Sequence, residues 1–379
     1  MAREMARKTF DEVVLFARTG LNPRTNFKLG QGSNKYITIK NIHDNTIVID
    51  ENTDLVDDEA IRMIHRRSQI NKGDVLFCSI GRMGDMYIIE EDPVGWDINE
   101  SVFAFTLDTS IIRQKYFYYI FKNGATIEYL SKNSSGSTFK SIKMNQLKKM
   151  VFDLPPLDKQ DHIVRLLDNV SLIIAMRQKE LQQLDDLIKA RFVEMFGDPV
   201  LNQKRFPVYR MDEVVEFQGG SQPDKKYFEY EPTPDNIRLI QIRDYKTDNY
   251  ITYIPKSMAK RYCTAEDIMI GRYGPPIFQI LQGIEGSFNV ALMKATPKIG
   301  NREFIRYFLK QECLLQYLEG MSKRTAGQDG IQMDKLKAYP FPMPPSEDQE
   351  LFEKFVKQTD KSKCDTSNIT SATQYQLAS

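Results

Sequence analysis

A long segment without proline or glycine lies in the middle of this chain, between Pro155-Pro156 and Gly197-Asp198-Pro199. Proline and glycine end helices, so the residues between these clusters can form one uninterrupted helix. Its apolar residues recur at alternating spacings of three and four, with one slip of register: Ile163, Leu166, Val170, Ile173, Ile174, Leu181, Leu184, Ile188 and Met195. This pattern predicts a coiled-coil-type helix of roughly 50 Å that packs against another helix and acts as a spacer.

The sequences on either side of this helix resemble each other as an ordered series of short blocks. Asp11-Glu12-Val13-Val14 recurs as Asp212-Glu213-Val214-Val215, and Leu154-Pro155-Pro156 with Gln160 recurs as Met343-Pro344-Pro345 with Gln349. The blocks between them keep their order, while the intervals between them change as loops of different length would require. Chance gives one or two such echoes but not a whole series, so the sequence predicts a duplicated domain of about 150 residues.

Within each copy, short β-rich runs are bounded by turn residues, and residues 115–131 and 302–320 have helical patterns. We therefore expect an α+β fold with two pseudo-repeated globular domains joined by the long helix. After residue 362 the chain is polar and has no apolar seam, which predicts a short second helix and a disordered tail. The expected parts are a first domain, the spacer helix, a second domain, and the short helix with its tail: 1–154, 155–200, 201–343 and 344–379.

Composition limits the classes of protein that remain. The chain has 379 residues with a formal net charge of +1, so any nucleic-acid contact must come from local basic patches. Four well-separated cysteines without a Cys-x-x-Cys pair argue against zinc or a disulfide framework and fit a reducing cytoplasm. No signal peptide or membrane span is recognisable, so we expect a cytoplasmic protein.

Enzyme motifs are missing from the sequence. There is no phosphate-binding P-loop, and the three histidines, His43, His65 and His162, are scattered. Leu154-Pro155-Pro156-Leu157 lacks the polar first residue with which an amino-methyltransferase holds an exocyclic amine. We therefore expect no catalysis, no metal site and no cofactor bound by this chain itself.

A loop rich in small hydroxyl residues, glycine and lysine precedes a short helix in the first copy. Small residues leave backbone N–H groups open to an anion, and the lysines add charge, which predicts phosphate contact. The alternative is a flexible surface loop capped by serine or threonine, and recurrence in both copies favours phosphate. The candidates in the first copy are Ser135, Gly136, Ser137, Thr138, Lys140 and Lys143, and those in the second are Lys323, Arg324, Thr325, Gly327 and Gln328.

Two further sets of residues are candidates for contact with bases. Arg82 and Arg272-Tyr273 lie on glycine-flanked turns after strands, where a guanidinium can reach a guanine edge; a solvated arginine is the equal alternative. Lys40-Asn41 and Arg243 end two strands and can also reach bases. The basic runs Arg62 to Arg67 and Lys256 to Arg261 have the pattern of solvated helix faces, with phosphate tracking as the less favoured interpretation.

These features together resemble the specificity subunit of type I restriction–modification systems, over about residues 10 to 362. The motifs that carry the resemblance are the two Pro-Pro-x-x-x-Gln steps, the two Gly-Asp-Val-Leu-like strands, and Arg191-Phe192-Val193-Glu194-Met195-Phe196-Gly197-Asp198-Pro199. The resemblance implies that each domain reads one half of a split, asymmetric site in double-stranded DNA, and that the long helices fix the half-site spacing.

The resemblance also implies the partners. Methyltransferase subunits dock on the helices and methylate adenine N6 with S-adenosylmethionine, and restriction subunits join them, so that S-adenosylmethionine, ATP and magnesium are expected on the partners. The short second helix departs from the family, which suggests a truncated variant that holds one methyltransferase subunit weakly or pairs as a homodimer. A coiled-coil scaffold that binds proteins without catalysis is the rival hypothesis.

Overall fold

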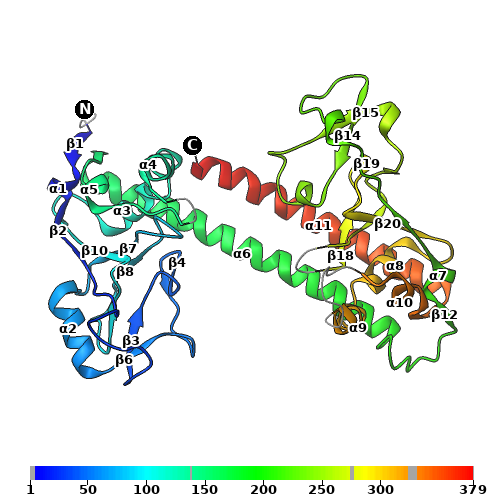
Figure 1. Ribbon diagram of the computed structural model, residues 1–379, viewed down its shortest axis with the longest axis horizontal. Coiled ribbons are helices and arrows are strands. Elements are labelled where there is room, and N and C mark those ends of the chain that lie inside the picture. The colour runs from blue at the N-terminus through cyan, green and yellow to red at the C-terminus, as the bar shows by residue number, and fades with distance from the viewer. Residues whose placement is uncertain (1–4, 137–138, 274–276, 323–330, 379) are drawn as a thin grey trace. The chain divides into compact units, whose positions relative to one another are not determined.

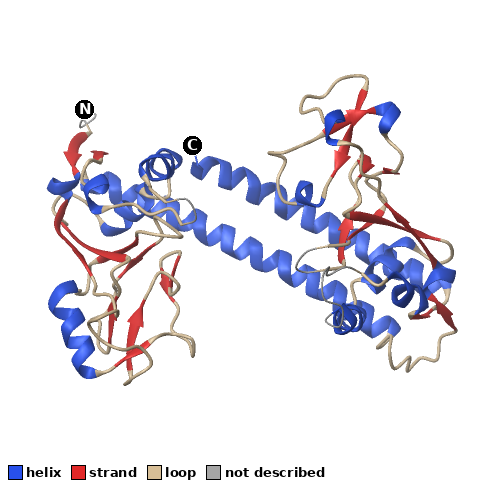
Figure 2. Cartoon of the chain, viewed as in Figure 1, coloured by secondary structure: helices blue, strands red, loops and turns tan. Residues whose placement is uncertain are grey.

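The computed structural model describes residues 5–136, 139–273, 277–322 and 331–378 (Figures 1 and 2). The chain divides into two compact units, and each of the two boundaries falls inside a long helix. Unit 1 is residues 1–177 together with 368–379, and unit 2 is residues 178–367.

Unit 1 is built on an antiparallel sheet with the strand order β2-β10-β7-β8. A smaller sheet, β6-β3-β9, pairs β3 with β9 in parallel, and β1 pairs with β11. The strands are β1 (Ala6–Thr9), β2 (Val14–Thr19), β3 (Asn34–Ile37), β4 (Ile42–His43), β5 (Thr46–Ile47), β6 (Leu55–Val56), β7 (Val75–Cys78), β8 (Met86–Ile88), β9 (Trp96–Ile98), β10 (Val102–Leu107) and β11 (Val151–Leu154). The helices are α1 (Phe10–Val13), α2 (Asp58–Ser68), α3 (Gln114–Ile120), α4 (Gly124–Asn133) and α5 (Met144–Leu147).

Strand β7 is buried on both faces, so the loop that follows it starts from a fixed position. Val75 and Phe77 belong to the cluster that packs against α3, with Phe77 5.5 Å from Phe121 between ring centroids. Leu76 and Cys78 point to the other face and pack with the residues of the smaller sheet. A strand that is covered on both faces is expected to have only apolar residues. Residues 75–78 fit this, because all four are apolar and buried.

Unit 2 repeats this topology, with the sheet order β13-β20-β17-β18 and a parallel pair β14–β19. Its strands are β12 (Val208–Arg210), β13 (Val215–Gly219), β14 (Asn236–Ile240), β15 (Tyr253–Pro255), β16 (Tyr262–Cys263), β17 (Ile268–Gly271), β18 (Gln279–Gln282), β19 (Gly286–Phe288), β20 (Leu292–Pro297) and β21 (Pro340–Pro342). Its helices are α7 (Met211–Val214), η1 (Lys225–Tyr227), η2 (Ile242–Tyr245), η3 (Lys256–Met258), α8 (Arg302–Leu309), α9 (Glu312–Ser322) and α10 (Met333–Ala338).

The predicted α+β fold with a duplicated domain is confirmed by this shared topology. β12 pairs with β21 as β1 pairs with β11, and β17 lies between β20 and β18 as β7 lies between β10 and β8. The copies differ at one edge, where unit 2 adds β16 beside β19. The two predicted helices at 115–131 and 302–320 are each broken into two, and in unit 1 the break is at Asn123, whose side chain caps α4.

The predicted long helix is confirmed as α6 (Leu157–Phe196), 40 residues and therefore about 60 Å. Its last turns belong to the core of unit 2. Phe192 and Phe196 pack on Phe352 of α11 (Ser346–Ala378) with ring centroids 5.5 Å apart in each pair. Farther along the same two helices, the Lys363 ammonium lies 2.8 Å from the Asp185 carboxylate.

The expected short second helix is wrong. α11 continues through 33 residues, including the polar stretch that we expect to be disordered. The physical reason is that no proline or glycine follows Pro345, so nothing in the sequence breaks the helix. A polar sequence indicates that a segment buries few side chains, but such a segment can still be helical.

Candidate nucleic-acid interface

Three loops of unit 1 meet beyond the end of β7. The turn after this strand carries Arg82, whose guanidinium contacts the ring of His43 and lies 3.4 Å from the Ile39 carbonyl oxygen. In the same turn the Gly81 N–H donates to the Lys140 carbonyl oxygen at 3.3 Å. These bonds join three segments that we call the unit 1 loop cluster: residues 38–47, residues 79–85, and residues 134–136 with 139–143.

The first segment is shaped by its own polar side chains. Asn41 is 7 % exposed; its Oδ1 accepts from the Thr38 N–H at 2.9 Å and its Nδ2 donates to the Val48 carbonyl at 3.0 Å. Asp44 and Asn45 have φ of 45° and 63°, the left-handed conformation of a type I′ hairpin turn between β4 and β5. Of the predicted pair, Asn41 therefore has its side chain engaged inside the turn, while Lys40 is exposed beside it.

Arg82 is half exposed, and His43 holds its position. The Nε2 of His43 lies 2.6 Å from the Lys40 carbonyl oxygen, to which it donates, and this assigns Nδ1 as the acceptor for the Arg82 guanidinium. Asp85 lies 3.8 Å from the Arg82 Nε. Each guanidinium nitrogen of Arg82 therefore has a neighbour inside the cluster, and the two terminal nitrogens each carry a second N–H that an outside acceptor such as a guanine or a phosphate can use.

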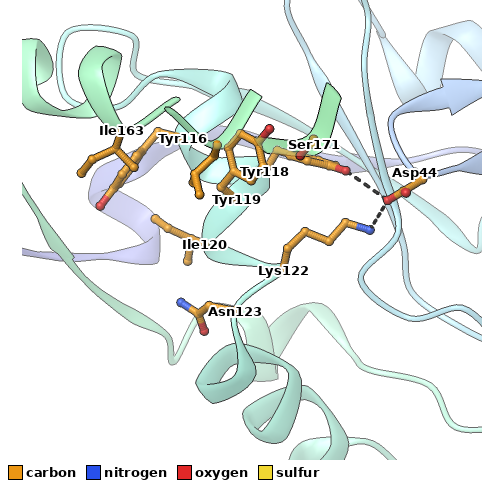
Figure 3. Close-up of a pocket in the computed structure, with 10 residues that line it drawn as sticks. Asp44, Tyr116, Tyr118, Tyr119, Ile120, Lys122, Asn123, Ile163 and Ser171 are labelled. Carbon is orange, nitrogen blue, oxygen red and sulfur yellow. Dashed lines mark hydrogen bonds and ion pairs between the residues drawn. The ribbon is translucent and has the colours of Figure 1, made fainter. Parts of the chain in front are cut away.

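The β4–β5 hairpin is tied to α3 by Asp44. Its carboxylate lies 2.7 Å from the Lys122 ammonium and accepts from the Tyr118 hydroxyl at 3.1 Å (Figure 3). The Lys122 ammonium lowers the pKa of Asp44 below its usual value, so the pair stays charged at neutral pH. These side chains line a pocket of about 350 Å³ with Tyr116 and residues of the first turns of α6.

The third segment of the cluster is closed by a backbone pair and carries two lysines. Ser135 and Ser141 exchange backbone hydrogen bonds of 2.9 and 2.8 Å. Gly136 has a φ of 114°, and a Cβ on it would lie 2.2 Å from the Phe139 carbonyl oxygen, so glycine is required there. Lys140 and Lys143 are exposed, but α5 has only four residues and offers no long helix terminus, so any phosphate contact depends on the lysines and backbone N–H groups.

Unit 2 builds the equivalent place from different residues. In both units an isoleucine of the first loop packs on a glycine near the end of the buried strand: Ile39 on Gly81, in the turn after β7, and Ile242 on Gly271, the last residue of β17. Arg243, next to Ile242, donates from Nη2 to Thr252 Oγ1 at 3.1 Å, and its guanidinium lies 5.8 Å from the ring centroid of Tyr250. Arg243 and Tyr250 line a pocket of about 490 Å³ together with Asn249 and Asp248.

Arg272 does not take the position of Arg82. The strand registers pair Gly271 with Leu292 and Cys78 with Val102, so Arg272 corresponds to Ser79. Arg272 donates from Nη1 to the Val290 carbonyl at 3.4 Å, and its guanidinium lies 5.3 Å from the ring centroid of the exposed Tyr273.

The structure gathers most of the predicted residues of unit 1 at one place: Lys40, Asn41, Arg82, Ser135, Gly136, Lys140 and Lys143. In unit 2 the contact of Ile242 with Gly271 joins the segment that carries Arg243 to the one that carries Arg272 and Tyr273. The remaining candidates lie outside the described residues: Ser137, Thr138, Lys323, Arg324, Thr325, Gly327 and Gln328.

Sequence reasoning missed residues that the structure places beside these candidates. His43 and Asp44 organise the cluster of unit 1, and Tyr250, 62 % exposed, stands over Arg243 in unit 2. The dipeptide Asp44-Asn45 is itself a type I′ hairpin signal that could have been found. The role of Tyr250 has no comparable signal, because it depends on how a long loop folds back onto η2.

Among the described residues, no group of three or more histidine, cysteine or acidic side chains could hold a metal ion. Burial raises the pKa of the Cys78 thiol to about 12, so this thiol is not a nucleophile at neutral pH. The search for membrane spans over the described part of the chain finds no helix that is long and apolar enough.

A family profile described as the type I restriction modification DNA specificity domain matches residues 4–186 and again residues 203–372. A putative type I restriction enzyme MjaX specificity subunit from Methanocaldococcus jannaschii is 23 % identical over 321 residues, which cover 76 % of this chain and 72 % of that protein. The type I restriction enzyme MjaIX specificity subunit of the same organism is 25 % identical over 169 residues, 36 % of this chain and 39 % of that protein.

Two solved structures have a similar fold. The type I restriction–modification S subunit from M. genitalium is 14 % identical with a TM-score of 0.53, over 98 % of this chain and 93 % of that one. A chain solved in work on complex assembly and conformational transition of the type I R-M system is 16 % identical with a TM-score of 0.56, over 100 % of this chain and 97 % of that one. At these sequence identities, the two similarities show a shared fold and nothing further.

Proposed function

Because this chain belongs to the type I restriction–modification DNA specificity family, we propose that it reads a bipartite, asymmetric site in double-stranded DNA for such a system. Each unit reads one half of the site. The loop cluster of unit 1 reads the first half, and the residues around Arg243 and Arg272 read the second half.

The observation that carries this proposal is that the same topology presents different side chains at the same place. Lys40 and Arg82 with His43 stand where unit 2 has Arg243 with Tyr250. Two duplicated domains that recognise different bases should share the same strands and helices and differ in the side chains of the loops that contact DNA. A scaffold that binds only proteins has no need of arginines at both tips.

The partners follow from the same membership. We propose that methyltransferase subunits, and restriction subunits with them, assemble on this chain in the cytoplasm, and that the chain itself catalyses nothing. S-adenosylmethionine, ATP and magnesium belong to those subunits in this proposal. The hypothesis of a truncated helix that weakens methyltransferase binding or forms a homodimer is set aside, because α11 supplies 33 helical residues.

The experiment is a map of N6-methyladenine in the genome of the host, with this chain present, deleted, or replaced by Arg82→Ala. We expect methylation at one split asymmetric motif, its loss on deletion, and weaker methylation with relaxed preference in one half of the motif for the variant. Loss of one bidentate arginine contact costs about 1–3 kcal/mol, or roughly 5- to 150-fold in discrimination.

The matched control is Arg7→Ala, which removes an exposed arginine from β1. It should leave both halves of the motif unchanged. A motif that survives deletion of the chain contradicts the proposed function. A motif that Arg82→Ala leaves intact in both halves removes Arg82 from the reader and leaves the function standing.

A further inference from the structure

A second basic site lies on unit 1, away from the loop cluster. It is a pocket of about 400 Å³ between α2 and the beginnings of β3 and β9, and we call it the α2 pocket. Arg62, His65 and Arg66 line one wall, and Trp96 and Asn34 line the other. Figure 1 shows α2 at the opposite end of this unit from β1.

The charges of this pocket share one face of α2. Spacings of three and four place Arg62, His65 and Arg66 on the outer side of the helix, while Ala60 and Ile64 pack inward. All three outer side chains are exposed. Within the described part of the chain, neither arginine forms a salt bridge with an acidic side chain. In a chain with 52 basic and 51 acidic residues, two adjacent unpaired arginines are available for an outside anion.

His65 is held at the wall of the pocket by a buried carboxylate. Its Nδ1 lies 3.1 Å from Oδ2 of Asp97, and Asp97 is buried, with its Oδ1 accepting from the Ile98 N–H at 2.7 Å. Burial raises the pKa of Asp97, and the bond to His65 opposes that shift. With Nδ1 held by a fixed carboxylate, Nε2 is the nitrogen left for a ligand in the pocket.

The separation between the α2 pocket and the loop cluster is short enough for both to contact one DNA duplex. Asn34 begins β3 and Lys40 lies in the turn after it, so the two residues are at most about 20 Å apart. Half a helical turn of B-DNA is roughly 17 Å. A protein that reads bases at one place therefore meets the sugar–phosphate backbone again at about this separation. Unit 2 also carries exposed basic residues, Lys260 and Arg261, directly before β16.

We propose that the α2 pocket binds a nucleotide phosphate, and that duplex DNA flanking the half-site of unit 1 supplies it. Arg62 and Arg66 neutralise the phosphate, His65 lines the pocket beside them, and Trp96 forms the apolar wall against the sugar. This site contributes affinity and not sequence preference, because a phosphate is the same beside every base. The inference rests on the proposed DNA reading.

Trp96 is the only tryptophan of the chain, so its fluorescence reports on this pocket alone. The full chain is titrated with a duplex that contains its site and, separately, with adenosine monophosphate. We expect the duplex to change the fluorescence saturably and the mononucleotide to have no effect at the same phosphate concentration. Trp96→Phe should abolish the signal and keep DNA binding, measured by anisotropy of a labelled duplex.

The double variant Arg62→Ala/Arg66→Ala tests the charges. We expect about tenfold weaker binding of all duplexes at 0.15 M salt, an unchanged ranking of sequences, and a slope of log K against log salt that is smaller by about two. The control, Arg7→Ala/Lys149→Ala, removes the same charge elsewhere in unit 1 and should leave affinity and slope unchanged.

The outcomes separate this inference from the proposed function. If the chain binds its duplex but the slope of the Arg62→Ala/Arg66→Ala variant is unchanged, or Trp96 does not respond, the α2 pocket is not a DNA site and the proposed function stands. A response that adenosine monophosphate reproduces identifies a free nucleotide as the ligand and overturns the duplex assignment. If no duplex binds, with or without methyltransferase subunits, the proposed function fails.

Discussion

A buried glutamine fixes the start of each long helix. The Nε2 of Gln160 donates to the Ile111 and Pro155 carbonyls at 2.9 Å each, and its Oε1 accepts from the Arg113 N–H at 2.9 Å. Gln349 repeats this in unit 2, with bonds to the Asn301 N–H and the Pro344 carbonyl at 2.7 Å each. The recurring Pro-Pro-x-x-x-Gln step is therefore a clamp between a helix and the sheet domain before it.

Replacement of Gln160 by alanine leaves three buried backbone groups without a partner. We expect Gln160→Ala to lower the free energy of unfolding of unit 1 by about 2–4 kcal/mol, from the usual value of a buried hydrogen bond and the penalty for an unpaired group. Urea unfolding followed by circular dichroism measures it. Gln178→Ala, exposed on the same helix, is the control with no expected change; equal effects of the two would contradict the clamp.

Sequence alone indicates which residues can contact DNA but not which are free to do so. Lys40 and Asn41 are adjacent, polar and follow the same strand, yet one is exposed and the other is buried within its turn. Arg82 and Arg272 both follow a buried strand beside glycine, yet the strand registers place them three residues apart in the repeat. Such distinctions depend on hydrogen bonds between segments distant in sequence, which residue type and spacing do not encode.

At the scale of elements, the apolar pattern predicts α6 well and α11 poorly. The spacing of three and four and the flanking prolines indicate a helix where α6 lies. The pattern does not show that the last turns of α6 enter the core of unit 2 through Phe192 and Phe196. The same spacing of apolar residues suits a helix that packs on one other helix and a helix that packs on a whole domain. The repeated blocks predict the duplicated domain, since a block takes the same structure in both units: residues 11–14 and 212–215 each end a short helix and begin a strand.

Two neighbouring residues of α11 test how this helix is held. Phe352 is 0 % exposed and touches the rings of Phe192, Phe196 and Tyr307, whereas Leu351 beside it is 54 % exposed. We expect Phe352→Ala to destabilise unit 2 by about 3–5 kcal/mol and Leu351→Ala by less than about 1 kcal/mol. Guanidinium unfolding of both variants checks this, and similar losses would mean that α11 is not seated as described.

At the scale of the whole molecule, the chain has two units with separate aromatic cores. Phe117 is central to the core of unit 1, and Phe304 to that of unit 2. Each core is closed by strands and helices of its own unit, with α6 running through both. A chain built in this way should not unfold in a single all-or-none step.

We expect calorimetry of the full chain to show two thermal transitions. Phe117→Ala should lower one of them and Phe304→Ala the other, each by about 10 °C, because a loss of 3–5 kcal/mol shifts the melting temperature of a domain of this size by roughly that amount. One transition that both variants lower equally would show that the units unfold together.

In the antiparallel pairs β1–β11 and β12–β21, the first strand of each repeat lies beside its last strand. Everything between two such paired strands can therefore be exchanged for the interior of another repeat, with only two short junctions to rejoin. Both repeats share this pairing of their first and last strands. Under the proposed function, one recombination event could therefore give a host gene a new DNA target, without a long series of point substitutions.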